Sequence, residues 1–308
     1  MLLLLEQILN GLQFGFMLFL LAAGLTLVFG IMHLLNLAHG SLYMIGAYTA
    51  ATVTAATGHF SLGVLAALLV TALAGMLLEA GVFRRLYQRE HLDQVLATFA
   101  VIFTVNELTR ILWGRAPLYL DIPPALAGTI EIIPGAPYPV YRLLIIAVGA
   151  LVALGLYVLI NHTRLGMLIR AGASNREMVG ALGANIKLLY TLVFGLGALL
   201  AGLAGALAGP ILAIEVGMGE NILILTFVVV VIGGIGSVRG ALLGALLVGL
   251  TDTLGRAFLP GLFALVLPPA PATAAGSSLA SITIYLLMVL ILVFRPQGLF
   301  PVQGQHGA

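Results

Sequence analysis

Long apolar stretches, separated by short polar or glycine-containing breaks, run through almost the whole chain. Many approach or reach the roughly 20 residues that cross a bilayer as an α-helix. Two pairs of neighbouring stretches, the first and second and the seventh and eighth, are separated only by short breaks, so each pair is either two spans or one broken helix. The predicted spans lie near residues 7–31, 40–58, 61–83, 94–113, 140–160, 187–211, 221–235, 240–257 and 279–296. This pattern predicts an all-α integral membrane protein, a polytopic helical bundle of about 8–9 spans.

Composition and charge support the same class of protein. Of 308 residues, 61% are hydrophobic and 8% are charged, whereas soluble domains have about 25% charged residues. The chain has no cysteine, which excludes disulfides and thiol chemistry. A net charge of +2, with the basic residues scattered between spans, does not indicate a nucleic-acid partner. The N-terminus has no basic segment before its apolar run and is interpreted as the start of a retained span. We therefore treat residues 1–308 as a single transmembrane domain.

Basic residues in the short loops predict the orientation, because Arg and Lys concentrate on the cytoplasmic side. They follow the third, fifth and last predicted spans: Arg84, Arg85, Arg89, Arg164, Arg170, Arg176, Lys187 and Arg295. Nine crossings then place the N-terminus outside and the C-terminus inside. With one crossing fewer, the N-terminus would lie inside. The proline-rich outer loop, 114–139, contains "TIEIIPGAPYPV", which is either a small β-hairpin turning at Pro134-Gly135 or an irregular loop.

Two segments hint at an internal repeat. "NLAHGSLYMIG" (36–46) and "GSVRGALLGAL" (236–246) each open a Gly/Ala-rich helix and share Gly at the fifth position and Leu at the seventh. On the predicted topology both helices run in the same direction, so the pattern suggests a parallel repeat.

The cytoplasmic loop 161–187 contains an unusually polar stretch, "TRLGMLIRAGASNREMVGALGANIK". Ser174 and Glu177 have the spacing of a capping box, in which each side chain satisfies a backbone N–H of the first helical turn. Gly183 is placed to end the same helix in a left-handed conformation. The predicted helix has about eight residues, roughly 12 Å, and is too short to cross a membrane.

One face of this short helix is apolar. Met178, Val179 and Leu182 recur at helical spacing, opposite Asn175 and Arg176. A short, capped helix with an apolar stripe on the cytoplasmic side is interpreted as a docking surface for another protein. The alternative from the residues alone is a helix that lies on the lipid headgroups.

The stretch resembles the coupling loop of ABC-transporter permeases, whose signature begins Glu-Ala-Ala and has Gly six positions after the Glu. Glu177 and Gly183 match that spacing, whereas Met178 and Val179 replace the two alanines and the closing Ile-x-Leu-Pro is missing. Together with "GLTLVFGIMHLLNLAHGSLYMIGAY" (24–48) and "VIGGIGSVRGALLGALLVGL" (231–250), it resembles the permease of branched-chain amino acid (Liv-type) ABC importers. The similarity runs from about Gln7 to "FRPQGLFP" (294–301).

The resemblance implies a multi-pass subunit of a bacterial inner-membrane importer for branched-chain amino acids. Its implied partners are a second permease subunit, two ATP-binding subunits and a periplasmic substrate-binding protein. The resemblance favours a second permease that is a different chain. It implies ATPase coupling through Ser174, Arg176, Glu177, Met178, Val179, Leu182 and Gly183. The sequence has no G-x-x-x-x-G-K-[ST] motif, so ATP should be bound by partner chains, and no cofactor is expected in this one. The alternative is a stand-alone secondary transporter or channel, which would not need a docking helix.

Polar and glycine residues at the two breaks are candidates for the solute path. They are Asn36, His39, Gly40, Gly233, Gly234, Gly236 and Ser237. Such residues either line the path or satisfy backbone groups where a helix is interrupted in the membrane. His33 and His39 are six residues apart and off a common helical face, so a metal site is not expected.

Three pairs of opposite charge lie near the ends of spans. Glu107 can pair with Arg110 and Asp252 with Arg256, and Glu79 has Arg84 and Arg85 nearby. Local neutralisation is favoured over a proton relay, which would need unpaired carboxylates deep in several spans.

Overall fold

The computed structural model describes residues 2–300 except 33, 35, 88 and 134. Within these residues the chain forms α-helices, two short 3₁₀ helices and one hairpin. The helices are α1 (Leu2–Met32), α2 (His39–Thr57), α3 (Phe60–Gly81), α4 (His91–Trp113), α5 (Val140–His162), α6 (Arg164–Ser174), α7 (Arg176–Ala181), α8 (Ile186–Ala208), α9 (Met218–Gly233), α10 (Val238–Phe263) and α11 (Pro269–Phe294). The remaining elements are η1 (Phe83–Arg85), η2 (Pro124–Leu126), β1 (Thr129–Ile133) and β2 (Ala136–Pro139).

Each predicted span coincides with a helix, which confirms the all-α, multi-pass architecture. Among the described residues, seven helices are long and apolar enough to cross a membrane: α1, α3, α4, α5, α8, α10 and α11. The other two spans, α2 and α9, have 19 and 16 residues. A 16-residue helix is about 24 Å long, less than the hydrocarbon core of roughly 30 Å. α2 begins seven positions after α1 ends, and four residues separate α9 from α10, so both predicted breaks are present.

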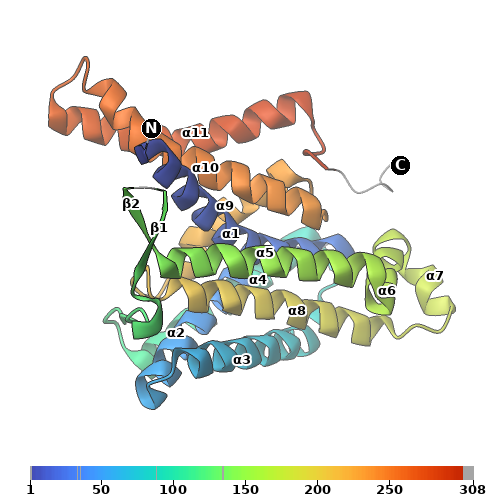
Figure 1. Cartoon of the computed structure of the whole chain (residues 1–308). Helices are drawn as coiled ribbons and strands as arrows, with labels where there is room; N and C mark the ends of the chain where they lie inside the picture. The colour runs from blue at the N-terminus through green and yellow to red at the C-terminus, as the bar shows by residue number, and fades with distance from the viewer. Residues whose placement is uncertain (1, 33, 35, 88, 134, 301–308) are drawn as a thin grey trace.

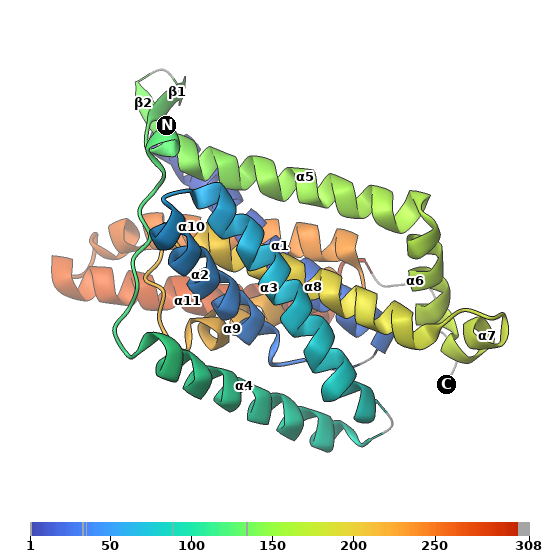
Figure 2. The same cartoon turned by 90° about the horizontal axis from the view of Figure 1, so that it is seen from below.

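The helices are elongated along a common direction, with different features at the two ends (Figure 1). The N-terminal end of α1 and the hairpin lie at one end, and α6 and α7 lie at the other. Seen from below, α4 and α5 occupy opposite edges of the bundle (Figure 2). β1 pairs with β2 in antiparallel register, Thr129 opposite Pro139, so the hairpin interpretation of the outer loop is confirmed. The hairpin and the polar loop thus occupy opposite ends, as the predicted crossings require.

Two helices form the interior of the bundle. In the most apolar stretches of α1 and α8, 78% and 72% of residues are buried, against 17% in α5 and in α11. α1 packs most extensively on α10, and α8 packs on α2 and α3. The outer helices therefore expose large apolar side chains, including Leu151 and Leu154 of α5, as helices in contact with lipid do.

Glycines let the short helices pack with their backbones in contact. Gly40 in the first turn of α2 faces Gly219 in the first turn of α9, and a Cβ on either would lie closer than 3.0 Å to the other's carbonyl oxygen. A Cβ at Gly46 of α2 would clash in the same way with the backbone of Gly202 in α8. Close approach through small residues is the usual means of helix association in membranes.

The two short helices meet at their N-terminal ends inside the bundle. From that crossing α2 runs towards the hairpin end and α9 runs towards the end that carries α7 (Figure 2). The helix after each one folds back onto it: Gly63 of α3 lies against α2, and Gly244 of α10 lies against α9. The units α2–α3 and α9–α10 are therefore structural counterparts with opposite orientation.

The parallel repeat of 36–46 with 236–246 stays a prediction. α2 and α10 run in the same direction, as that repeat requires, whereas α2 and α9 run in opposite directions. The shared glycine has different surroundings in the two segments, because Gly40 crosses α9 whereas Gly240 packs on Gly233 within the α9–α10 turn. The common Gly and Leu pattern reflects two separate close contacts.

We predict that Gly40→Ala lowers the thermal unfolding midpoint of the purified protein. The added methyl group has no space beside Gly219, and overpacking of this kind costs about 1–3 kcal/mol. Gly155→Ala in α5 is the matched control, since a Cβ there meets nothing within 4 Å. A midpoint for Gly40→Ala equal to that of Gly155→Ala would contradict the crossing.

Candidate functional site: the loop between α5 and α8

The loop between α5 and α8 folds into two helices, of which sequence reasoning predicted only the second. α6 begins at Thr163, whose side chain accepts a hydrogen bond from the Gly166 backbone N–H at 3.1 Å. Gly166 sits against the carbonyl groups of Leu159 and Ile160, so α6 turns sharply away from α5. The Thr163 cap and Gly166 were the signals in the sequence that would have revealed α6.

α7 is capped differently from the predicted capping box. Ser174 is the last residue of α6, and Asn175 takes the N-cap position, where its Oδ1 accepts from the Met178 backbone N–H at 2.9 Å. The prediction of a capping box between Ser174 and Glu177 is therefore wrong, because the preceding helix extends through Ser174. Glu177 still lies in the first turn of α7, where a carboxylate favours the positive end of the helix dipole.

The predicted helix end at Gly183 is confirmed. Gly183 has a φ of +89° and donates to the Gly180 carbonyl at 3.0 Å, and Ala184 donates to the Val179 carbonyl at 3.2 Å. This pair of bonds is the Schellman motif, which needs a residue in the left-handed conformation. Asn185 then caps α8 by accepting from the Leu188 backbone N–H at 3.0 Å. Caps at 163, 175, 183 and 185 thus fix the shape of the loop.

The apolar stripe of α7 divides into an anchor and an exposed pair. Val179 is 7% exposed and is the buried residue of this helix. Met178 is 59% exposed and Leu182 is 81% exposed. Met178 lies on this six-residue helix and Leu182 is its C-cap residue, and together the two large apolar side chains form a surface suited to contact with another molecule.

A groove of about 540 Å³ lies beside the start of α7. Ser174, Arg176 and Glu177 line one side. The other side is lined by the end of α1 and by Tyr87, Arg89, His91 and Gln94. Of the predicted coupling residues, these three therefore face the groove, Met178 and Leu182 face outward, and Val179 and Gly183 hold the helix in place.

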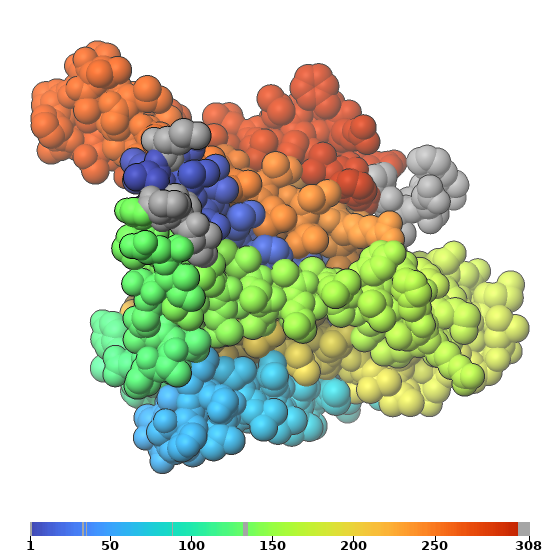
Figure 3. Space-filling view, in the orientation of Figure 1, coloured from blue at the N-terminus to red at the C-terminus, as the bar shows by residue number. Residues whose placement is uncertain are grey.

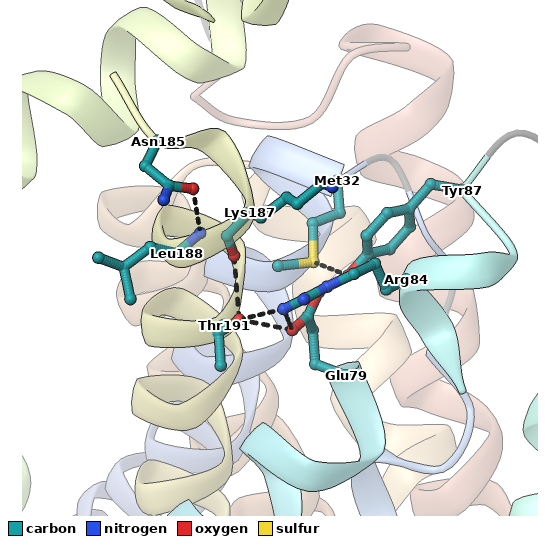
Figure 4. A network of polar contacts seen from close by, with 8 residues as sticks. All are labelled: Met32, Glu79, Arg84, Tyr87, Asn185, Lys187, Leu188 and Thr191. Atoms are coloured by element: carbon teal, nitrogen blue, oxygen red, sulfur yellow. Dashed lines mark hydrogen bonds and ion pairs between the residues drawn. The ribbon is translucent and has the colours of Figure 1, made fainter. Parts of the chain in front are cut away.

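A buried carboxylate connects the start of α8 to α3 (Figure 4). Glu79 is fully buried and accepts two hydrogen bonds from Arg84, from Nε at 3.2 Å and from Nη2 at 2.8 Å. Thr191 of α8 donates to the same carboxylate at 2.7 Å, and the Tyr87 hydroxyl donates at 3.1 Å. A buried charge is tolerated when it is paired and hydrogen-bonded in this way.

The pKa of Tyr87 is raised well above its usual value, first by burial and then by the Glu79 carboxylate. The phenol therefore stays protonated and keeps donating to Glu79. Sequence reasoning predicted an Arg84 or Arg85 partner for Glu79, and the structure selects Arg84. Sequence reasoning could not identify Thr191 or Tyr87 as partners of Glu79, because these contacts depend on how α8 and the loop after η1 pack.

The residues predicted for the solute path lie in two separate places. Asn36 and His39 are fully buried, and Gly40 forms the crossing with α9. The Asn36 amide has no hydrogen-bond partner among the described residues. The second group lies around the α9–α10 turn, where Gly234 and Gly236 have positive φ, Gly233 packs on Gly240, and Ser237 caps α10 by accepting from the Gly240 backbone N–H.

The charged pairs near the span ends are present as predicted. Arg110 contacts Glu107 at 2.6 Å and Arg256 contacts Asp252 at 2.8 Å. No group of three or more His, Asp or Glu side chains in the described part of the chain is arranged to hold a metal ion. His33, considered above with His39, lies outside the described residues.

A polytopic bundle with short helices that meet inside it, and a capped helical loop at one end, is consistent with the class of membrane transport permeases. Residues 7–292 match the family described as "Branched-chain amino acid transport system / permease component", and the chain belongs to this family.

Named relatives match nearly the whole chain. The high-affinity branched-chain amino acid transport system permease protein BraD of Pseudomonas aeruginosa is 32% identical over 96% of this chain and 95% of its own length. Permease protein LivH of the corresponding system in Escherichia coli is 26% identical over 96% of this chain and 94% of its own length. A probable LivH of Methanocaldococcus jannaschii is 27% identical over 84% of this chain and 83% of its own length. No solved structure matches the chain significantly.

We predict that Arg84→Met lowers the thermal unfolding midpoint more than Glu79→Gln does. Removing Arg84 leaves a fully buried carboxylate without its cation, at a cost of about 3 kcal/mol, whereas Arg84 keeps 34% exposure and can reach water when Glu79 is neutral. Arg85→Met, an exposed neighbour, is the control. Equal midpoints for Arg84→Met and Arg85→Met would show that the Glu79 network is not stabilising.

Proposed function

We propose that this chain is the permease subunit of an ATP-driven importer in a bacterial inner membrane, and that it transports branched-chain, hydrophobic amino acids. The observation that carries the proposal is the docking loop, in which α7 exposes Met178 and Leu182 at the end opposite the hairpin. Membership of the permease family and the names of the relatives support the substrate class. A stand-alone transporter or channel has no use for such a surface, which disfavours that alternative.

The proposed assembly contains a second, different permease subunit, two ATP-binding subunits and a periplasmic substrate-binding protein. The sequence lacks a phosphate-binding loop, so ATP binding and hydrolysis belong to the partner subunits and this chain needs no cofactor of its own. The ATP-binding subunits seat on α7 and its groove. The hairpin end, opposite, faces the binding protein.

Coupling in this proposal runs through α8. A force on α7 reaches α8 through the turn at Gly183 and the Asn185 cap, since only four residues separate the two helices. α8 is joined to Glu79 through Thr191 and packs on α1, α2 and α3. A shift of α8 therefore moves the helices that surround the crossing of α2 and α9.

The proposed solute path follows the two helix breaks. Asn36 and His39 are fully enclosed, so the described state is closed at this level and α2 must shift before a solute passes them. The surroundings are otherwise apolar, which suits a leucine-like side chain that has lost its water. Gly233, Gly234, Gly236 and Ser237 form the second break, nearer the docking end, where a turn rather than a helix borders the path.

We predict that Leu182→Glu lowers substrate-stimulated ATPase activity of the assembled importer by about tenfold or more. The carboxylate would be forced into an apolar contact without a partner, and tenfold corresponds to only about 1.4 kcal/mol. Asn175→Ala should lower the stimulated ATPase activity less than Leu182→Glu does. Losing a cap costs about 0.5–2 kcal/mol of helix stability and leaves the apolar surface unchanged.

Leu265→Glu is the matched control for Leu182→Glu. Both leucines are 81% exposed, but Leu265 lies in the α10–α11 turn, away from α7 (Figure 1). Leu265→Glu should leave the ATPase activity of the complex without binding protein unchanged, because the proposed ATP-binding subunits seat at the opposite end. A Leu182→Glu complex that assembles and hydrolyses ATP at the rate of the Leu265→Glu complex would show that α7 does not couple the subunits.

A further inference from the structure

A cavity of about 430 Å³ lies between α1, α5, α6 and the α9–α10 turn, on the face that α5 covers. Along α1 it extends from Phe19 to Ile31, twelve positions or about 18 Å. Most of its lining is apolar, including Leu27, Ala153 and Leu242. The cavity is therefore long, apolar and placed within the depth of the membrane.

One end of this cavity carries positive charge. Arg170 of α6 and Arg239 of α10 both line it, at the end of the bundle where α6 lies close to the first turn of α10 (Figure 3). Arg239 lies over the ring of Tyr157, 5.3 Å from its centroid, and Arg170 donates to the Ile160 carbonyl. The ion pairs of the described residues are those of Arg84, Arg110 and Arg256, so neither cavity arginine has a carboxylate partner.

One buried polar atom beside the cavity lacks a partner. Thr26 of α1 is fully buried and lines the cavity, and its hydroxyl has no hydrogen-bond partner in the part of the chain that the structure describes. Asn161 and Ser237 line the same space.

We infer that this cavity binds an anionic phospholipid of the cytoplasmic leaflet. The phosphate lies between Arg170 and Arg239, and an acyl chain fills the apolar part along α1. The ester oxygens lie at about the depth of Thr26. Basic pockets between helices on the cytoplasmic side are suited to anionic headgroups. An amino-acid substrate fits less well, because no Asp or Glu among the described residues lines the cavity to receive its ammonium group.

Bound lipid would tie α6 to α10, two elements otherwise joined through α1 and α5. Its effect on stability is separate from transport, so the inference stands independently of the proposed function. The acyl chain would also cover apolar lining, such as Leu242, that protein atoms leave open.

The test measures the thermal unfolding midpoint of the full chain in detergent micelles as phosphatidylglycerol is added, with native mass spectrometry to count bound lipid. Phosphatidylglycerol should raise the midpoint, whereas phosphatidylcholine, inorganic phosphate and leucine should not. In the double variant Arg170→Gln/Arg239→Gln, the phosphatidylglycerol concentration that gives half of the maximal increase in unfolding midpoint should rise about thirtyfold.

Two further variants make the test specific. Arg164→Gln/Arg295→Gln removes the same charge from exposed positions outside the cavity and should respond as the original chain does. Ala153→Phe fills the acyl region while leaving both arginines, and should lose bound phosphatidylglycerol. An unchanged response in the Arg170→Gln/Arg239→Gln variant would overturn the inference. An equal response to inorganic phosphate or leucine would also overturn it, since the site would then bind a small soluble ligand rather than a lipid.

Discussion

The contact between Gly40 and Gly219 is the constraint on which the bundle depends. Two helices start in its interior, and neither α2 nor α9 has a side chain capping its first turn. Water is scarce at this depth, so the free N–H groups must be enclosed by protein. Enclosure is possible because glycines let the two first turns touch, and because Glu220 places a carboxylate in the first turn of α9, where Asn106 donates to it at 3.0 Å. The positions of α3 and α10 follow, since each folds back on one of the short helices.

Sequence patterns predicted most of the fold because the membrane imposes a strong length and polarity signal. Every apolar run became a helix, and the Pro134-Gly135 turn signal marked a real hairpin. Local charge spacing likewise predicted the pairs of Arg110 and Arg256. The contacts of the two repeat segments were not predictable in this way, because Gly40 and Gly240 share a pattern while their contacts depend on which helix lies opposite.

The candidate site was predicted in outline and corrected in detail. Gly183 ends α7 as predicted from the residue type, since few residues other than glycine adopt a φ of +89° without strain. The start of α7 was misplaced by one residue, because Ser174 and Asn175 are both good caps and the choice depends on how far α6 continues. The link through Thr191 to Glu79 joins residues 112 positions apart, so no local pattern reveals it.

The central claim is that α7 is covered by a separate protein, and protection of a single cysteine tests it most directly. The chain has no cysteine, so Leu182→Cys and Leu265→Cys each provide one reactive thiol at sites that are equally exposed. The rate of reaction with a water-soluble maleimide is measured for the chain alone and for the complex with the proposed ATP-binding subunits. We expect the rate at position 182 to fall about tenfold on assembly, because interface cores exclude water, and the rate at position 265 to stay unchanged. An intact complex in which position 182 reacts as fast as in the chain alone would contradict the account.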